Sequence, residues 1–92
     1  MANYIISYDL NGQTPTHQQM DAHLEKLGAS RGRILETVWY VGYAGTTGQL
    51  FDHINSILSK NDRLIVVAAS DAVFTNLLIT EKSLVDAWRS NR

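Results

Sequence analysis

The sequence predicts a single α+β domain, on the basis of three observations. The chain has 92 residues, which leaves no room for two hydrophobic cores. Short apolar segments rich in β-branched and aromatic residues alternate with segments whose apolar residues recur at helical spacing. Turn-forming residues such as Asn11-Gly12 and Asn61-Asp62 separate these segments. We assign residues 3–69 to the core of the domain and residues 70–92 to a C-terminal extension.

Residues 4–9 (YIISYD) predict a first strand at the centre of the sheet, because this run is short and suits a pleated surface. Alternation assigns its side chains to two faces, with Tyr4, Ile6 and Tyr8 on one and Ile5, Ser7 and Asp9 on the other. Asp9 ends the strand, at the kind of position where open α/β layers hold their chemistry. Its carboxylate either belongs to such a site or is a structural one that accepts N–H groups of the Asn11-Gly12 turn.

A first helix is predicted to start at Thr14-Pro15, with Thr14 as its cap, and to end at Gly28. Met20, Leu24 and Leu27 form its apolar stripe. The histidines of the chain are interpreted as packed or surface residues without a functional role, namely His17, His23 and His53.

Residues 33–43 are dense in strand formers and predict either one long bent strand or two strands joined near Glu36 and Thr37. Their alternation gives two apolar faces, with Ile34, Val38 and Tyr40 on one and Leu35, Trp39, Val41 and Tyr43 on the other.

A second helix is expected over residues 46–60, opened by a capping box between Thr46 and Gln49. Its broad apolar stripe consists of Leu50, Phe51, Ile54, Ile57 and Leu58. Residues 63–69 (RLIVVAA) then predict a strand without a polar face, which is typical of a strand covered on both sides.

Residues 72–80 fit either an edge strand or an irregular return. A final short helix is expected after Thr80, which is its predicted cap, and a contact between Ile79 and Leu84 is predicted to brace its start. Leu84, Val85 and Trp88 form its apolar side, so Trp88 is predicted to dock this helix on the domain.

The resulting order of elements is the βαββαβ plan of the ferredoxin-like sandwich, with two helices on one face of an antiparallel sheet. Both faces of the predicted sheet are apolar, which indicates that the face without helices is buried. We expect a two-fold homodimer to bury it. The predicted interface consists of Leu35, Trp39, Val41 and Tyr43. The alternative is that residues 72–92 fold over this face.

Composition limits the classes of partner. A net charge of −1 and a pI near 6.2 argue against a broad basic surface, so Arg31 and Arg33 are the local candidates for nucleic-acid binding. The chain has no cysteine and no signal-peptide pattern, and we expect a cytoplasmic protein. Its longest later apolar run, Leu64 to Ala69, is too short to cross a bilayer, so no membrane partner is expected.

Three motifs together resemble the Cas-two family of small CRISPR-associated adaptation proteins, and at the same level the VapD-type toxins. The first strand ends in Tyr8-Asp9-Leu10, and the second-strand signature appears as Thr37-Val38-Trp39 with Gly42. A capped helix from Thr46 to Lys60 and an aliphatic strand introduced by Asp62 follow. The similarity covers about residues 3 to 69.

This resemblance implies a homodimer in which the two copies of Asp9 face each other across the axis. In family members with nuclease activity this pair holds a divalent metal, which implies Mg²⁺ or Mn²⁺ and a metal-dependent endoribonuclease or deoxyribonuclease with Asp9 as metal ligand and catalytic residue. Partners implied are RNA or DNA and a protein of an adaptation or toxin-antitoxin system. The chain departs from the family, because no arginine follows Asp9 within residues 11–16. A non-catalytic dimeric scaffold is the alternative, since one fold serves several functions.

Overall fold

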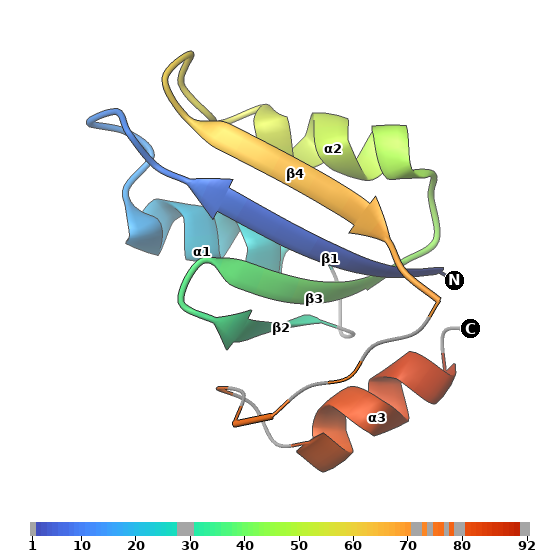
Figure 1. The fold of residues 1–92 in the computed structure, drawn as a ribbon. Helices are drawn as coiled ribbons and strands as arrows, with labels where there is room; N and C mark the ends of the chain where they lie inside the picture. The colour runs from blue at the N-terminus through green and yellow to red at the C-terminus, as the bar shows by residue number, and fades with distance from the viewer. Residues whose placement is uncertain are drawn as a thin grey trace.

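The computed structural model describes residues 2–27, 31–70, 73, 75, 76, 78 and 81–90. Its elements follow the order β1 (Ala2–Asp9), α1 (His17–Glu25), β2 (Arg31–Leu35), β3 (Val38–Tyr43), α2 (Thr47–Asn55), β4 (Arg63–Ala68) and α3 (Glu81–Ser90). The four strands form one antiparallel sheet in the order β2-β3-β1-β4 (Figure 1). The α+β class is therefore confirmed.

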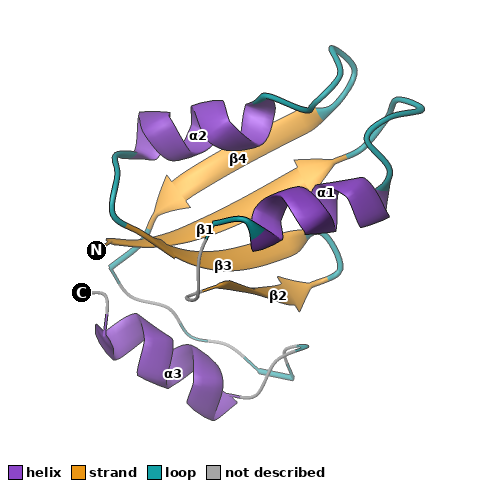
Figure 2. Cartoon of the chain, turned by 180° about the vertical axis from the view of Figure 1, so that it is seen from behind, coloured by secondary structure: helices purple, strands orange, loops and turns teal. Residues whose placement is uncertain are grey.

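β1 lies in the middle of the sheet, between β3 and β4, as predicted. Its burial alternates, and Tyr4, Ile6 and Tyr8 are buried on one face. Helices α1 and α2 cover this face (Figure 2) and complete the main core with Met20, Leu24, Leu50 and Ile54. The same sequence pattern that defined the strand thus also defines the face on which the two helices pack.

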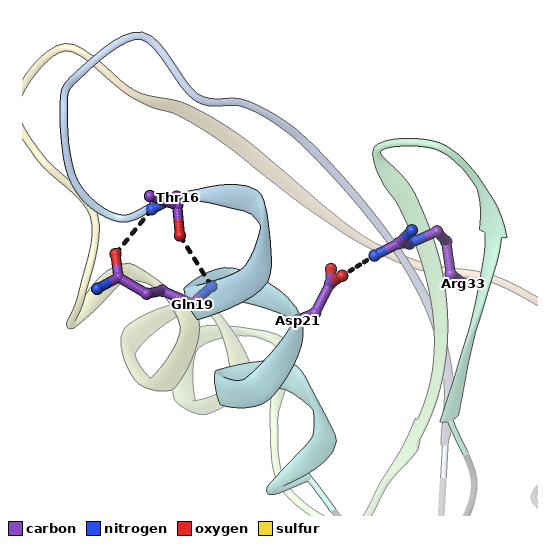
Figure 3. Close-up of polar contacts among 4 residues, drawn as sticks. All are labelled: Thr16, Gln19, Asp21 and Arg33. Atoms are coloured by element: carbon purple, nitrogen blue, oxygen red, sulfur yellow. Dashed lines mark hydrogen bonds and ion pairs between the residues drawn. The ribbon is translucent and has the colours of Figure 1, made fainter.

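Both helices begin with a capping box. The prediction was right for α2, where Thr46 caps and Gln49 reaches back, but wrong for α1. There the cap is Thr16 rather than Thr14, and its partner is Gln19 (Figure 3). Thr16 has a glutamine three residues later and so satisfies two orphan N–H groups instead of one, which favours the later start. The predicted end at Gly28 is also too late, because α1 ends at Glu25 with Lys26 as its C-cap; Gly28 itself lies outside the described residues.

Helix α2 ends at Asn55, five residues earlier than expected. Ile57 and Leu58 follow it as turn and loop residues and still pack against the core. Phe51, which was predicted to face the core, is 37% exposed. The predicted stripe is too wide because Phe51, next to Leu50 on α2, lies off the face that Leu50 and Ile54 bury.

Residues 31–43 form two strands, β2 and β3, joined by a turn at Glu36 and Thr37. One of the two predicted alternatives is thereby confirmed. An irregularity in the pairing lies between Arg33 and Leu35, so Arg33 pairs with Trp39 whereas Leu35 pairs with Val38. Leu35 therefore lies on the face of Val38, away from α1 and α2, and not on the face of Trp39 as alternation predicted.

β4 is an edge strand that pairs only with β1 among the described strands. The prediction that it is covered on both sides is wrong for the single chain. Leu64 and Val66 pack toward the core, but Ile65 and Val67 on the other face are 58% and 44% exposed. The apolar residues of this strand therefore leave apolar surface exposed to solvent.

Helix α3 packs on part of the face that α1 and α2 leave free. Leu84 is buried there with Ile34 and Tyr40, and Ala87 and Trp88 pack against them. Trp88 stacks on Tyr40 with ring centroids 5.7 Å apart, and its carbonyl accepts from the Asn3 side chain. The predicted docking role of Trp88 is confirmed. The described positions among residues 72–80 contain no strand, and the predicted contacts of Ile79 and Thr80 lie outside the described residues.

Candidate functional site

Asp9 is the last residue of β1 and lies on the face that α1 and α2 do not cover. It pairs across the sheet with Arg63, the first residue of β4, and paired residues of antiparallel strands share a face. Arg63 Nη1 lies 3.9 Å from Asp9 Oδ2. Both side chains are open to solvent, 63% exposed for Asp9 and 79% for Arg63. The carboxylate is thus accessible and has one loosely held cationic neighbour.

The surface around this pair is apolar. Ser7 pairs with Ile65 and Ile5 with Val67, so these side chains continue the same face away from Asp9. We call Ser7, Asp9, Arg63, Ile65 and Val67 the β4 strip. A small hollow of about 170 Å³ lies at its charged end, between Asp9, Arg63 and Ile65. Tyr8 also borders this hollow, and burial raises the pKa of its phenol above the ordinary 10.0, so it adds no charge there.

The structural role considered for Asp9 belongs to Asp62 instead. Asp62 Oδ1 accepts from the backbone N–H groups of Asn11 and Gly12, at 2.7 and 3.2 Å. Its other oxygen accepts from the N–H of Ser59 at 2.8 Å. These hydrogen bonds, Ser59 first, lower the pKa of Asp62 below its ordinary 3.8. Because Asp62 holds the turn after β1, that turn does not require Asp9.

The two arginines predicted to bind nucleic acid lie on the opposite side of the sheet from Asp9. Arg33 pairs with Trp39 and Arg31 with Val41, so both share the face that carries the helices. Arg33 donates to Asp21 of α1 (Figure 3), and its guanidinium lies 5.8 Å from the centre of the Trp39 ring. The structure therefore does not bring Arg31 and Arg33 together with Asp9.

Arg31 and Arg33 line an open groove of about 480 Å³ together with the carboxylates of Asp21 and Glu25. Two positive and two negative side chains leave this groove without a strong net charge. It is therefore a poor phosphate-binding surface in this conformation.

The residues predicted for the dimer interface do not form one open surface. Trp39 and Val41 are 4% and 0% exposed because they lie beneath α1 and α2, and Tyr43 packs against the same core. Only Leu35 is open, at 48%. Alternation separated the two faces of β3 correctly, but the helices cover the face that had been assigned to the partner. The homodimer itself stays a prediction.

Arg63 is the site residue that the sequence analysis missed. It was treated as the start of a strand, and its relation to Asp9 appears only once β4 is paired antiparallel with β1. The signal was present in the topology, since β4 begins at the level where β1 ends.

Among the described residues, no group of three or more histidine, aspartate or glutamate side chains could hold a metal ion. A single chain therefore offers Asp9 as one carboxylate ligand at this site. A hard divalent cation such as Mg²⁺ often takes only one or two protein carboxylates, so the donor chemistry fits, provided that a second copy supplies the second ligand.

In the part of the chain that the structure describes, no helix is long and apolar enough to cross a membrane. No family model matches the chain.

Proposed function

We propose that this protein is a ferredoxin-like, Cas-two-like homodimer that associates with nucleic acid and cleaves phosphodiester bonds with a divalent metal held by Asp9. The observation that carries the proposal is the open Asp9 carboxylate at the charged end of the β4 strip. The strand order β2-β3-β1-β4, with α1 and α2 on one face, supports the ferredoxin-like assignment.

The proposed dimer forms through the β4 strip rather than through Trp39 and Val41. Ile65 and Val67 are exposed apolar side chains on an edge strand, and a bare edge is a template for association with another chain. A two-fold interface uses the same patch on both copies, so a partner seated on this strip would bring a second Asp9 to the same surface.

Each charged residue of the strip has a role in the proposed reaction. Asp9 would hold Mg²⁺ or Mn²⁺, which when bound acidifies a water molecule and stabilises charge on the transferring phosphoryl group. Arg63 would hold a phosphate oxygen of the backbone, because a guanidinium matches phosphate geometry. It would supply the positive charge that residues 11–16 do not.

The test is cleavage of labelled RNA and DNA by the purified protein in Mg²⁺ or Mn²⁺, with a chelator as the blank. Asp9→Asn is expected to lower the cleavage rate roughly 100-fold or more, since a metal contributes several kcal/mol to such a transition state. Asp52→Asn, on the exposed side of α2, is the matched control and should cleave normally. Equal cleavage by wild type and Asp9→Asn would refute the assignment of Asp9.

A non-catalytic dimeric scaffold is the second candidate, and one observation favours it. Asp9 already has a cationic neighbour in Arg63, and a surface ion pair of this kind can be merely structural. The scaffold predicts that Asp9→Asn preserves every function, whereas a charge placed on Ile65 separates the copies.

A further inference from the structure

Two histidines that the sequence analysis set aside form a direct contact between α1 and α2. His23 of α1 and His53 of α2 stack with ring centroids 4.5 Å apart and an angle of 6° between the rings. His23 is only 9% exposed. The contact joins the two helices that together cover one face of the sheet (Figure 2).

Hydrogen bonds fix the His23 ring in this stack. Its Nε2 lies 2.7 Å from the His53 carbonyl oxygen, and Ser56 Oγ is 3.5 Å from the same nitrogen. A carbonyl oxygen only accepts, so His23 Nε2 carries the proton. Ser56 Oγ donates to the same carbonyl oxygen. The carbonyl of His53 therefore accepts two hydrogen bonds and holds the His23 ring at the end of α2.

A second proton has no favourable place in this arrangement. His53 Nε2 is buried and has no hydrogen-bond partner among the described residues. In the imidazolium form both ring nitrogens carry N–H, so that nitrogen would become a buried donor without an acceptor.

We propose that the His23–His53 stack is a proton-sensitive latch between α1 and α2, closed while the His53 ring is neutral and opened when acid protonates it. The charged and titratable groups that act on His53 are His23 of α1 and Lys26, the C-cap residue of α1. Neither offers a negative charge that would offset a second proton. A hollow of about 380 Å³ is lined by His23 and Lys26, so water can reach the His23 side of the stack.

The direction of the pH effect follows from His53. Burial first, and then the charges of His23 and Lys26, lower the pKa of His53 below its ordinary 6.5 and outweigh a hydrogen bond with the His23 backbone that raises it. The folded protein therefore binds this proton more weakly than the unfolded chain. The stability that the neutral stack contributes is fully present above pH 6.5 and is lost as the pH falls from 6.5 through the lowered pKa.

Urea unfolding between pH 7.5 and 5.5 tests the latch. The unfolding constant of the wild type is expected to rise several-fold over this range, whereas His53→Phe, which keeps a flat ring but cannot be charged, should show a clearly smaller rise. His17→Gln removes the exposed third histidine and should follow the wild type. An equal rise in wild type and His53→Phe would overturn the proposal.

A second measurement needs no substitution. Titration of the ring protons by NMR should give His53 a midpoint below 6.5. Amide hydrogen exchange, corrected for its intrinsic pH dependence, should show α1 and the end of α2 opening more often at pH 5.5 than at pH 7.5, while β1 stays protected. A His53 midpoint at or above 6.5 would contradict the latch even if the phenylalanine variant fails to fold.

Discussion

Asp9 and Asp62 lie at the same end of the sheet, but their surroundings give them different roles. Asp62 accepts three backbone N–H groups and ties the turn after β1 to the turn before β4. Among the described residues, the ion-pair partner of Asp9 is the guanidinium of Arg63. Most of the Asp9 side chain is exposed to solvent. A carboxylate that stabilises backbone is costly to remove, whereas an open one is free to bind a ligand.

Asp62→Ala is therefore expected to lower the melting temperature at pH 7, because it leaves the N–H groups of Asn11, Gly12 and Ser59 without their acceptor. The folded protein holds the pKa of Asp62 below 3.8, so its contribution is present above that pH and lost as the pH falls through the folded pKa. Thermal unfolding followed by circular dichroism should show the gap between wild type and variant narrowing in acid. Asp9→Ala should melt close to the wild type, and a larger loss for Asp9 than for Asp62 would reverse the two roles.

At the scale of the elements, α3 covers half of the sheet face that α1 and α2 leave free. Its Leu84, Ala87 and Trp88 pack with Ile34, Val38 and Tyr40, so the chain itself shields these residues of β2 and β3. Ile65 and Val67 of β4 stay open. The predicted covering C-terminal segment thus accounts for one half of this face, and the other half is where the predicted partner copy would have to bind.

Leu84→Ala tests how much α3 contributes. Leu84 is 3% exposed, and truncating a buried leucine costs roughly 2–5 kcal/mol through lost burial and the cavity left behind. Leu35→Ala is the matched control, since Leu35 is 48% exposed and should lose far less. Urea unfolding of both variants gives the comparison. Equal free energies of unfolding for the two variants would mean that α3 is not docked in solution.

Sequence reasoning predicted the elements well and their surroundings less well, for physical reasons. Period-two alternation in β1 gave the correct buried side chains, because only one face of that strand can be apolar throughout. In β3 both faces are apolar, so alternation separated Trp39 from Tyr40 but could not show which of them lies under α1 and α2. The irregularity at Leu35 broke the alternation altogether.

For a similar reason, the sequence predicted only one of the two charged residues of the candidate site. Asp9 was visible from its place after a strand, which is a local feature. Arg63 and the His23–His53 stack depend on contacts between segments far apart in the chain, 54 and 30 residues respectively, and single-residue patterns carry no such information. Knowledge of the strand order would have been enough to find Arg63.

At the scale of the whole molecule, the uncovered β4 strip predicts association. Wild-type protein at micromolar concentration should sediment as a particle of twice the 10.3 kDa chain mass, because Ile65 and Val67 leave apolar surface on a bare strand edge. Ile65→Lys should shift the protein to single chains, since a charge buried at a two-fold interface meets its own copy. Phe51→Lys, which places the same charge on another exposed apolar residue, should leave the dimer intact. The nuclease assay then separates the proposals: if the dimer supplies the second Asp9, Ile65→Lys loses cleavage together with the dimer, whereas a single-chain wild-type particle with normal cleavage would show that one Asp9 is enough.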